Sequence, residues 1–148
     1  MEIKVEIKEV SHEDLVNLLS TSLYGSQVFW GKRLAEYKPL ENKGEGNCIE
    51  DKMANVLLND GRIAFIDIEA EGEIYKNKGV LGFINEDGDA EYHFDLKAIK
   101  NGLKKALESK ERYLQLAAFD FLVDDGSFDA TDAENLMQMV LFGEVIYG

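Results

Sequence analysis

Apolar residues recur every three or four positions in five stretches of this chain, which is the spacing that lines one face of an α-helix. Several of these stretches begin at a residue that can cap a helix, and several end at a glycine. The expected caps are Ser11, Asn47, Asp95 and Thr131. The pattern predicts five helices, at residues 11–25, 47–59, 95–107, 111–123 and 131–143.

Four shorter stretches either alternate between apolar and polar residues or are continuously apolar, and both patterns predict β-strands. The turn Asn-Glu-Asp-Gly-Asp at 85–89 joins the last two strands, so we expect an antiparallel meander there. Residues 26–46 show neither period clearly, and their end is expected to be a loop. The predicted strands are 2–10, 62–69, 74–84 and 90–94.

The size and composition of the chain fit one globular domain. Its 148 residues lie in the commonest range for a single domain, and an apolar fraction of 45% is enough to build a core. No internal repeat or linker interrupts the pattern. We therefore predict one α+β domain over residues 1–148, with a small antiparallel sheet of three to four strands covered by four to five helices.

Charge is distributed unevenly along the sequence. The formal net charge is −13, and the 36 residues after Arg112 carry seven acids and no Lys or Arg. Binding to phosphates requires clustered cations, so nucleic acid and anionic membrane surfaces are disfavoured as direct partners. The main basic cluster, from Lys97 to Arg112, has helical spacing and is expected to form a solvated helix face.

Cysteine content and the length of apolar runs bear on the compartment. Cys48 is the single cysteine, which excludes a disulfide within the chain. Charged residues alternate from Glu2 onward, unlike a secretory leader. No apolar run approaches the roughly 20 residues that span a bilayer. We expect a cytoplasmic protein without a cofactor.

The sequence contains no nucleophile elbow, phosphate-binding glycine loop or paired-histidine zinc motif. One alternative is a small metal-dependent enzyme. Alternation in the predicted strand places Glu91, His93 and Asp95 on one face, and a paired strand would bring Asp67 or Glu69 close. One imidazole with several carboxylates suits a divalent ion. The competing interpretation, which we favour, is a polar outer sheet face that holds no metal.

Cys48 lies at the expected first turn of a helix, where the helix dipole lowers the pKa of a thiol. Nucleophilic catalysis also requires a base within hydrogen-bond distance, and His12 and His93 are the candidates. Cysteine is commonly a small buried hydrophobic residue instead. We therefore expect no catalytic residue.

The acidic segments are candidates for binding another protein. Duplex DNA carries one charge per about 1.7 Å, a density that seven carboxylates spread over a turn, a helix and a tail do not reach. A few well-placed carboxylates can nevertheless match the guanidinium groups of a basic pocket. Trp30 either contributes to an interface or covers the core. The expected partner-binding residues are Glu86, Asp87, Asp89, Asp124, Asp125, Asp129, Asp132 and Trp30.

Three segments, LLSTSLYG at 18–25, CIEDKMA at 48–54 and FGEVIYG at 142–148, resemble a loosely defined set of small acidic proteins. That set comes from bacteriophages and integrative elements of Gram-positive bacteria. Most of its members have no assigned activity, so no functional residue carries over. Small acidic proteins of such elements include anti-CRISPR inhibitors, which bind a Cas effector and block its contacts with nucleic acid. The resemblance implies that context.

Our leading hypothesis is a non-enzymatic protein-binding module whose acidic face occupies a basic surface on a nucleic-acid-handling host protein. A counter-defence inhibitor of a Cas effector is its most concrete version. The metal-dependent enzyme is one alternative. Another is a structural subunit that forms a homo-oligomer through its tail, from Val145 to Tyr147, or through Trp30.

Overall fold

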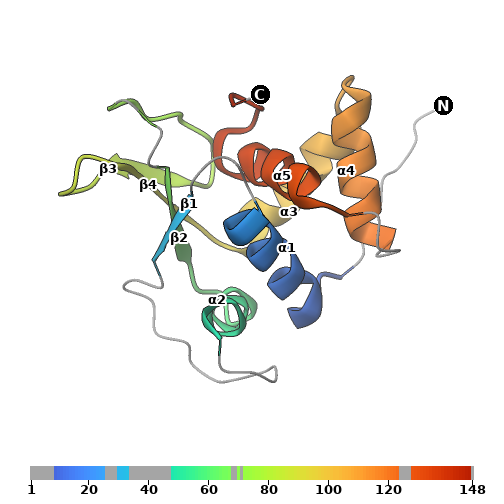
Figure 1. Ribbon diagram of the computed structural model, residues 1–148, viewed down its shortest axis with the longest axis horizontal. Helices are drawn as coiled ribbons and strands as arrows, with labels where there is room; N and C mark the ends of the chain where they lie inside the picture. Colours follow the sequence, from blue (N-terminus) through green and yellow to red (C-terminus); the bar gives the residue numbers. More distant parts are fainter. Residues whose placement is uncertain are drawn as a thin grey trace.

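The computed structural model describes residues 9–25, 30–33, 48–67, 70, 72–123 and 128–147. This part of the chain folds as one α+β domain with five helices and one antiparallel sheet, as predicted (Figure 1). The helices are α1 His12–Gly25, α2 Ile49–Leu58, α3 Leu96–Glu108, α4 Arg112–Val123 and α5 Ala130–Phe142. The strands are β1 Trp30–Arg33, β2 Ile63–Asp67, β3 Leu81–Ile84 and β4 Ala90–Phe94.

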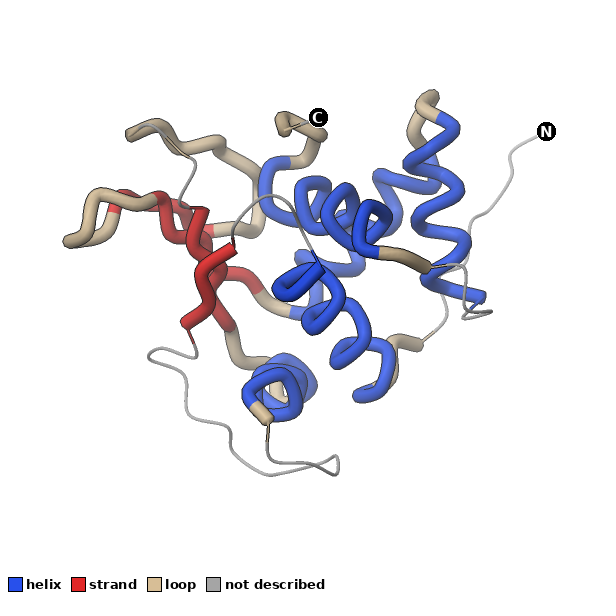
Figure 2. Tube along the Cα trace, viewed as in Figure 1, coloured by secondary structure: helices blue, strands red, loops and turns tan. Residues whose placement is uncertain are grey.

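The strands lie at one end of the molecule and most of the helices at the other (Figure 2). The order in the sheet is β1-β2-β4-β3, with every neighbouring pair antiparallel. Helix α3 follows directly after β4 and packs against α4 and α5, while α1 packs against α2 and α5. Strand β4 therefore connects the sheet to the helical layer, and β3 is one edge of the described sheet.

Aromatic side chains join the sheet to the helices. Phe65 of β2 and Tyr92 of β4 are paired in the ladder and fully buried. The ring of Tyr92 meets Phe142 of α5 edge-on at 5.2 Å, and Phe65 meets Phe94 edge-on at 5.4 Å. Such edge-to-face pairs are favourable because the positive edge of one ring meets the negative face of the other. This face of the sheet is the inner, core face.

Glycine allows α3 and α5 to cross closely. A Cβ atom added at Gly102 of α3 would lie 2.6 Å from Cγ2 of Val140 and 2.7 Å from its Cα, in α5. Backbone at that distance cannot move aside as the end of a flexible side chain can. The crossing is therefore possible only because residue 102 has no side chain.

Local hydrogen bonds explain where the helices begin, and they correct two of the predicted caps. Ser11 and Asp95 cap α1 and α3 as expected, since Ser11 Oγ accepts from the Asp14 amide and Asp95 from the Ala98 amide. The cap of α5 is Asp129 rather than Thr131, and Asp129 and Asp132 bond to each other's backbone amides. That reciprocal arrangement satisfies two amides that the first turn leaves unpaired.

The N-cap of α2 is Cys48 rather than Asn47, which lies outside the described residues, and the Cys48 side chain forms no cap bond. The predicted strand 74–84 is also too long, because β3 begins at Leu81. Polar groups before it bond elsewhere: the Tyr75 amide donates to the Tyr92 hydroxyl, and the Asn77 side chain to the Val140 carbonyl. The predicted strand 2–10 lies almost wholly outside the described residues.

Sequence periodicity places most helical core residues correctly. Leu15, Leu18 and Leu19 of α1 are fully buried, as are Ile99 and Leu103 of α3. Glycine ends α5 as expected, because Gly143 adopts the left-handed conformation at φ 77°. Within the described residues, no helix has the length and apolar character needed to cross a membrane.

The close crossing of α3 and α5 makes the stability of the fold sensitive to a side chain at position 102. We expect Gly102→Ala to lower the free energy of unfolding by about 1–3 kcal/mol, because the new methyl group overlaps the backbone of Val140. Alanine has the highest intrinsic helix propensity, by up to about 1 kcal/mol per residue. At an exposed position of α3, a substitution to alanine should therefore raise the free energy of unfolding. Urea unfolding of Gly102→Ala beside the control Asn101→Ala measures both. A Gly102→Ala protein as stable as the control would contradict the close crossing.

Candidate functional site

Glu91 and His93 lie on the sheet face opposite the core face, as alternation predicts, but they are not solvated. Only 3% of Glu91 and 2% of His93 is exposed. Nε2 of His93 lies 2.6 Å from Oε2 of Glu91, and the ring of Phe83 packs against the imidazole at 5.2 Å. The side-chain Nδ2 of Asn85 also donates to Oε1 of Glu91 at 3.4 Å. The pair holds polar groups together that would be costly to bury separately.

The register of the sheet separates the candidate metal ligands. Ile66 is the residue paired with Glu91, while Asp67 pairs with Ala90 and so shares the face of Phe65 and Tyr92. The metal-site alternative, which placed Asp67 or Glu69 near Glu91, loses Asp67 as a ligand, because a shift of one residue moves a side chain to the other face.

The other candidate ligands do not complete a metal site. Asp95 is occupied as the cap of α3, and Glu69 lies outside the described residues. In the described part of the chain, no three or more His, Cys, Asp or Glu side chains are grouped to hold a metal ion.

The C-terminal tail is held against its own domain by polar contacts that the sequence did not reveal. Oε1 of the buried Gln138 accepts from the amides of Ile146 and Tyr147, at 2.8 and 2.7 Å, and its Nε2 donates to the Tyr147 carbonyl at 2.9 Å. The Tyr147 hydroxyl donates to Oδ2 of buried Asp67 at 2.6 Å. These contacts give Asp67 a structural role, and they occupy the tail that the self-association hypothesis would use.

Cys48, Asp51 and His12 form a polar group where the first turns of α1 and α2 meet. Asp51 accepts a hydrogen bond from the thiol at 2.8 Å through Oδ2, and its Oδ1 lies 3.1 Å from Nε2 of His12. The bond to Asp51 raises the pKa of the Cys48 thiol, and the same bond, with that to His12, lowers the pKa of Asp51. The imidazole thus contacts the acid and not the sulfur. A thiol that stays protonated is a weak nucleophile.

The acids of the turn 85–89 lie at the tip of the hairpin formed by β3 and β4. Oδ1 of Asn85 accepts from the amides of Asp87 and Asp89, both at 3.0 Å, and the Asn85 amide bonds to the Asp89 carbonyl. Glu86 and Asp87 are exposed. Their carboxylates form no hydrogen bond or ion pair with the described residues, so an ordered turn presents them to solvent.

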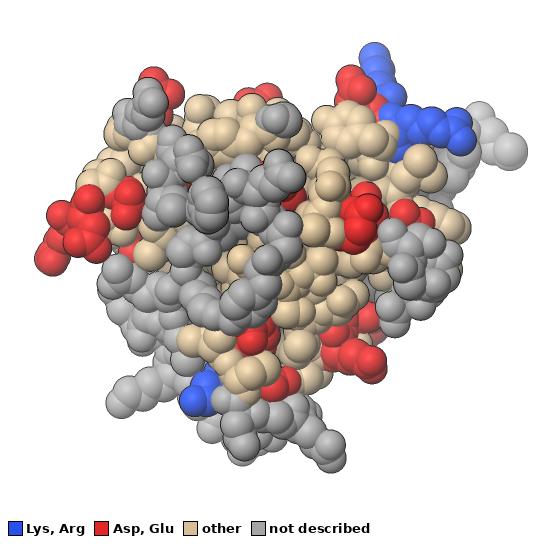
Figure 3. All heavy atoms as spheres, in the orientation of Figure 1, with Lys and Arg blue, Asp and Glu red and all other residues tan. Residues whose placement is uncertain are grey.

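The other acidic residues are placed differently. Asp129 and Asp132 cap α5 and bond to each other's backbone amides, and partial burial raises the pKa of Asp132. Asp124 and Asp125 lie outside the described residues, as does the side chain of Trp30. The hairpin tip lies at the left edge of the molecule in Figure 1, whereas α5 lies in its middle, and red atoms mark the hairpin end in Figure 3. Among the described residues, the acids of the turn 85–89 and those at the start of α5 therefore lie on separate elements.

Strand β3 is an exposed apolar edge beside the acidic tip. Leu81, Phe83 and Ile84 are exposed by 53%, 36% and 41%. The Asn85 amide donates to the Asp89 carbonyl, so this pair and every second pair along the ladder are the hydrogen-bonded ones. Gly82 and Ile84 belong to the pairs between them, and their backbone N–H and C=O groups therefore point away from β4. The sequence showed apolar residues here but could not show that the strand is an edge.

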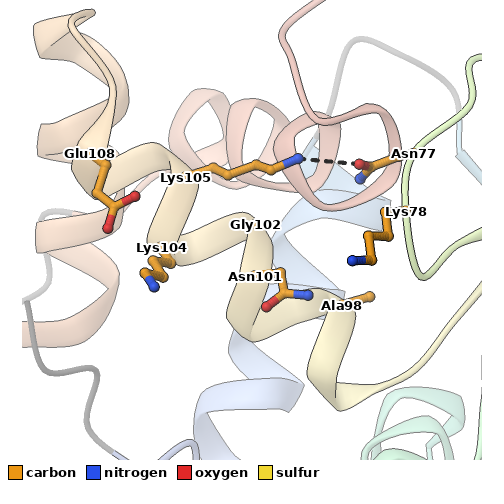
Figure 4. A pocket seen from close by; sticks show the side chains of 8 residues that line it. All are labelled: Asn77, Lys78, Ala98, Asn101, Gly102, Lys104, Lys105 and Glu108. Carbon is orange, nitrogen blue, oxygen red and sulfur yellow. Dashed lines mark hydrogen bonds between the residues drawn. The ribbon is translucent and has the colours of Figure 1, made fainter.

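A shallow hollow of about 280 Å³ lies between α3 and the segment before β3 (Figure 4). Lys105 reaches across it, and its Nζ lies 3.2 Å from Oδ1 of Asn77, while Lys78 extends toward Asn101. Amines and amides in this arrangement fit a small anion better than a cation. Every amine of the hollow is exposed, so such an anion would remain in competition with water, and the hollow is a weaker candidate than the hairpin.

The contact of Tyr147 with Asp67 predicts how stability depends on pH. Burial, and then the bond to Asp67, raise the pKa of the Tyr147 phenol. The folded state therefore keeps a proton that the unfolded chain releases above pH about 10, so this contribution to stability is complete below pH 10 and is lost as the pH rises further. Tyr147→Phe should lower the free energy of unfolding by about 1–3 kcal/mol at pH 7, because the hydrogen bond is lost. Above pH about 10, the free energy of unfolding of this variant should fall less steeply with pH than that of the wild-type protein.

Urea unfolding between pH 7 and pH 11 measures this difference between Tyr147→Phe and the wild-type protein. Equal pH dependence of the two proteins would contradict the role of Tyr147.

No family model, curated protein or solved structure matches this chain.

Proposed function

We propose that this chain is a non-enzymatic protein-binding module whose β3–β4 hairpin accepts a basic, extended segment of a partner protein. The observation that carries the proposal is the combination, on one element, of an exposed apolar sheet edge with an ordered acidic turn. The edge supplies backbone hydrogen bonds and apolar contact. The turn supplies charge.

The edge of β3 has the features that strand addition requires. Gly82 and Ile84 direct backbone donors and acceptors outward, and Leu81 and Phe83 offer apolar surface on one face. Soluble proteins usually protect such edges with lysine, proline or a bulge, because an open edge pairs with other chains. None of these protections occurs within β3, whose sequence is LGFI. In strand addition, backbone bonds supply affinity and the alternate side chains supply specificity.

The acidic turn supports a basic partner. Glu86, Asp87 and Asp89 follow β3 directly, and the whole chain carries a net charge of −13. Charge of this sign accelerates encounter with a positive surface and disfavours acidic partners. Proteins that handle nucleic acids carry such surfaces, and an inhibitor of a Cas effector is the narrower version of the proposal.

The remaining polar groups favour binding over catalysis. The Glu91–His93 pair is buried under Phe83, and Asp51 holds the Cys48 thiol in its protonated form. Each group therefore has a structural explanation that requires no reaction.

A short peptide of alternating Arg and Val residues provides a direct probe of the hairpin. We expect it to shift the NMR amide signals of residues 81–89, and we expect the same peptide with Glu in place of Arg to shift none of them. Glu86→Gln with Asp87→Asn should slow association about threefold or more at low salt, because two steering charges are lost. The control, Glu108→Gln with Glu111→Gln, removes the same charge at exposed sites outside the hairpin. Equal slowing by both double variants would contradict steering by the hairpin.

Backbone pairing at the edge can be tested separately from charge. Ile84→Pro removes an N–H that points away from β4, so it should leave the hairpin folded while abolishing binding of the Arg-Val peptide. Ile84→Ala keeps that N–H and should retain binding within a few fold. Far-UV circular dichroism verifies the fold of both variants, and titration calorimetry compares their affinities. Equal peptide affinity of the proline and alanine variants would rule out strand addition at β3.

The narrower version of the proposal, an inhibitor of a Cas effector, can be tested separately. Purified Cas effectors should bind the chain more tightly at 50 mM than at 500 mM salt, and should lose binding with the Glu86→Gln, Asp87→Asn variant. Absence of binding across a panel of effectors would remove this version and leave the peptide result standing.

A further inference from the structure

Helix α4 exposes an apolar stripe on the side that faces solvent. Tyr113, Leu116, Phe119 and Val123 follow one another at intervals of three or four, and each is 46–55% exposed. The opposite side of the same helix is buried against α3 and α5 through Leu114, Ala117, Ala118 and Phe121. A surface helix normally presents polar residues to water. Contiguous exposed apolar surface instead indicates a binding site.

We propose that this stripe is the interface of a homodimer, in which α4 packs against α4 of a second copy in antiparallel orientation around a two-fold axis at Leu116. Dimers of this kind bury the same patch on both subunits, so that patch must be complementary to itself. The charges and spacing of α4 meet that requirement.

The basic and acidic residues of α4 are arranged in the order that is unfavourable in an isolated helix. Arg112 lies in the first turn and Asp120 in the second half, whereas the helix dipole favours acids at the start and bases at the end. An antiparallel second copy reverses this disadvantage, because each Arg112 then meets an acid near the other helix's C-terminal end. In Figure 3, blue atoms gather at the upper right, where α4 begins in Figure 1.

The interface is also locally neutral. Residues 109–123 contain Lys110, Arg112, Glu111 and Asp120, for a net charge of zero in a chain of −13. Two copies can therefore approach along α4 without local repulsion. Repulsion between the distant acids is screened, since the Debye length at physiological salt is about 8 Å. A partner with a strongly basic surface, by contrast, would find no excess of acids on this stripe.

The spacing of the stripe fixes the register. An axis at Leu116 pairs Tyr113 with Phe119 of the second copy, and Arg112 with Asp120 of the second copy, twice each. Parallel packing would instead place Arg112 against Arg112. The stripe from Tyr113 to Val123 is about 15 Å long, so the interface is small and the dimer should dissociate reversibly on dilution.

Sedimentation equilibrium tests the dimer directly. We expect a monomer–dimer equilibrium in the wild-type protein that Leu116→Glu weakens at least tenfold, because two carboxylates would then meet at the axis. Leu81→Glu is the matched control, since it places the same charge on an exposed leucine of β3 at the other end of the molecule. A monomer at every concentration up to about 1 mM would overturn the proposal, as would an Leu116→Glu protein that dimerises like the control.

Two further variants test the orientation. In a Cys48→Ser background, Leu116→Cys should form a disulfide between copies under mild oxidation, and Val123→Cys should not, because only residue 116 faces itself. Arg112→Asp and Asp120→Arg should each weaken the dimer about three- to tenfold, and together should restore it. Cross-linking at 123 rather than 116, or no recovery in the double variant, would overturn the antiparallel register.

The dimer stands apart from the proposed function, because α4 and β3 lie at opposite ends of the molecule (Figure 1). Raising the salt from 50 to 500 mM should weaken binding of the basic peptide but should not dissociate the dimer, whose main contribution is apolar. Dissociation of the dimer at 500 mM salt would overturn an apolar interface. Each proposal can thus fail without the other.

Discussion

Burial of strand β4 on both faces is the constraint on which the rest of this fold depends. All five of its residues are buried, with Tyr92 and Phe94 toward the core and Glu91 and His93 on the other face. A strand buried on both faces is normally apolar throughout. Here the two polar side chains satisfy each other at 2.6 Å. Their pairing is compatible with a fully buried strand between β2 and β3 in a sheet of four described strands.

The buried pair of Glu91 and His93 also positions the hairpin formed by β3 and β4. Phe83 of β3 packs on the imidazole, and Asn85 links Glu91 to the acidic turn through its own side chain. On the core face, Gly82 lies so close to Tyr92 that an added Cβ would approach the ring to 3.1 Å. Edge strand and turn are thus fixed from both sides. Contacts of Gly82, Phe83 and Asn85 hold the acidic turn in place, and the acidic side chains need not contribute to them. The turn therefore loses less conformational entropy when a partner binds.

Prediction from sequence succeeded where the signal is local. The five helices, the caps Ser11 and Asp95, and the stop at Gly143 follow from spacing and from residues within one turn. Prediction failed where two residue pairs fit the same capping pattern. At the start of α5, Asp129 with Asp132 and Thr131 with Glu134 have the same spacing, and the structure uses the first pair.

Non-local features were beyond the sequence for a different reason. Strand register decided which face Asp67 occupies, and a turn after α5 brought Tyr147 to it across 80 residues. Of the candidate site, the acids of 85–89 were found as a turn signal. The exposed edge beside them depends on strand order, and the stripe of α4 depends on which of its two apolar faces is covered.

The proposed binding edge is a strand whose backbone groups alternate between the sheet and the solvent. Amide hydrogen exchange, followed by NMR with and without the Arg-Val peptide, measures that alternation residue by residue. In the free protein, the amide of Phe83 should exchange slowly because it bonds to β4, while those of Gly82 and Ile84 should exchange quickly. Added peptide should slow exchange at Gly82 and Ile84 by at least tenfold. Unchanged exchange at both positions, with the peptide bound, would contradict strand addition at β3.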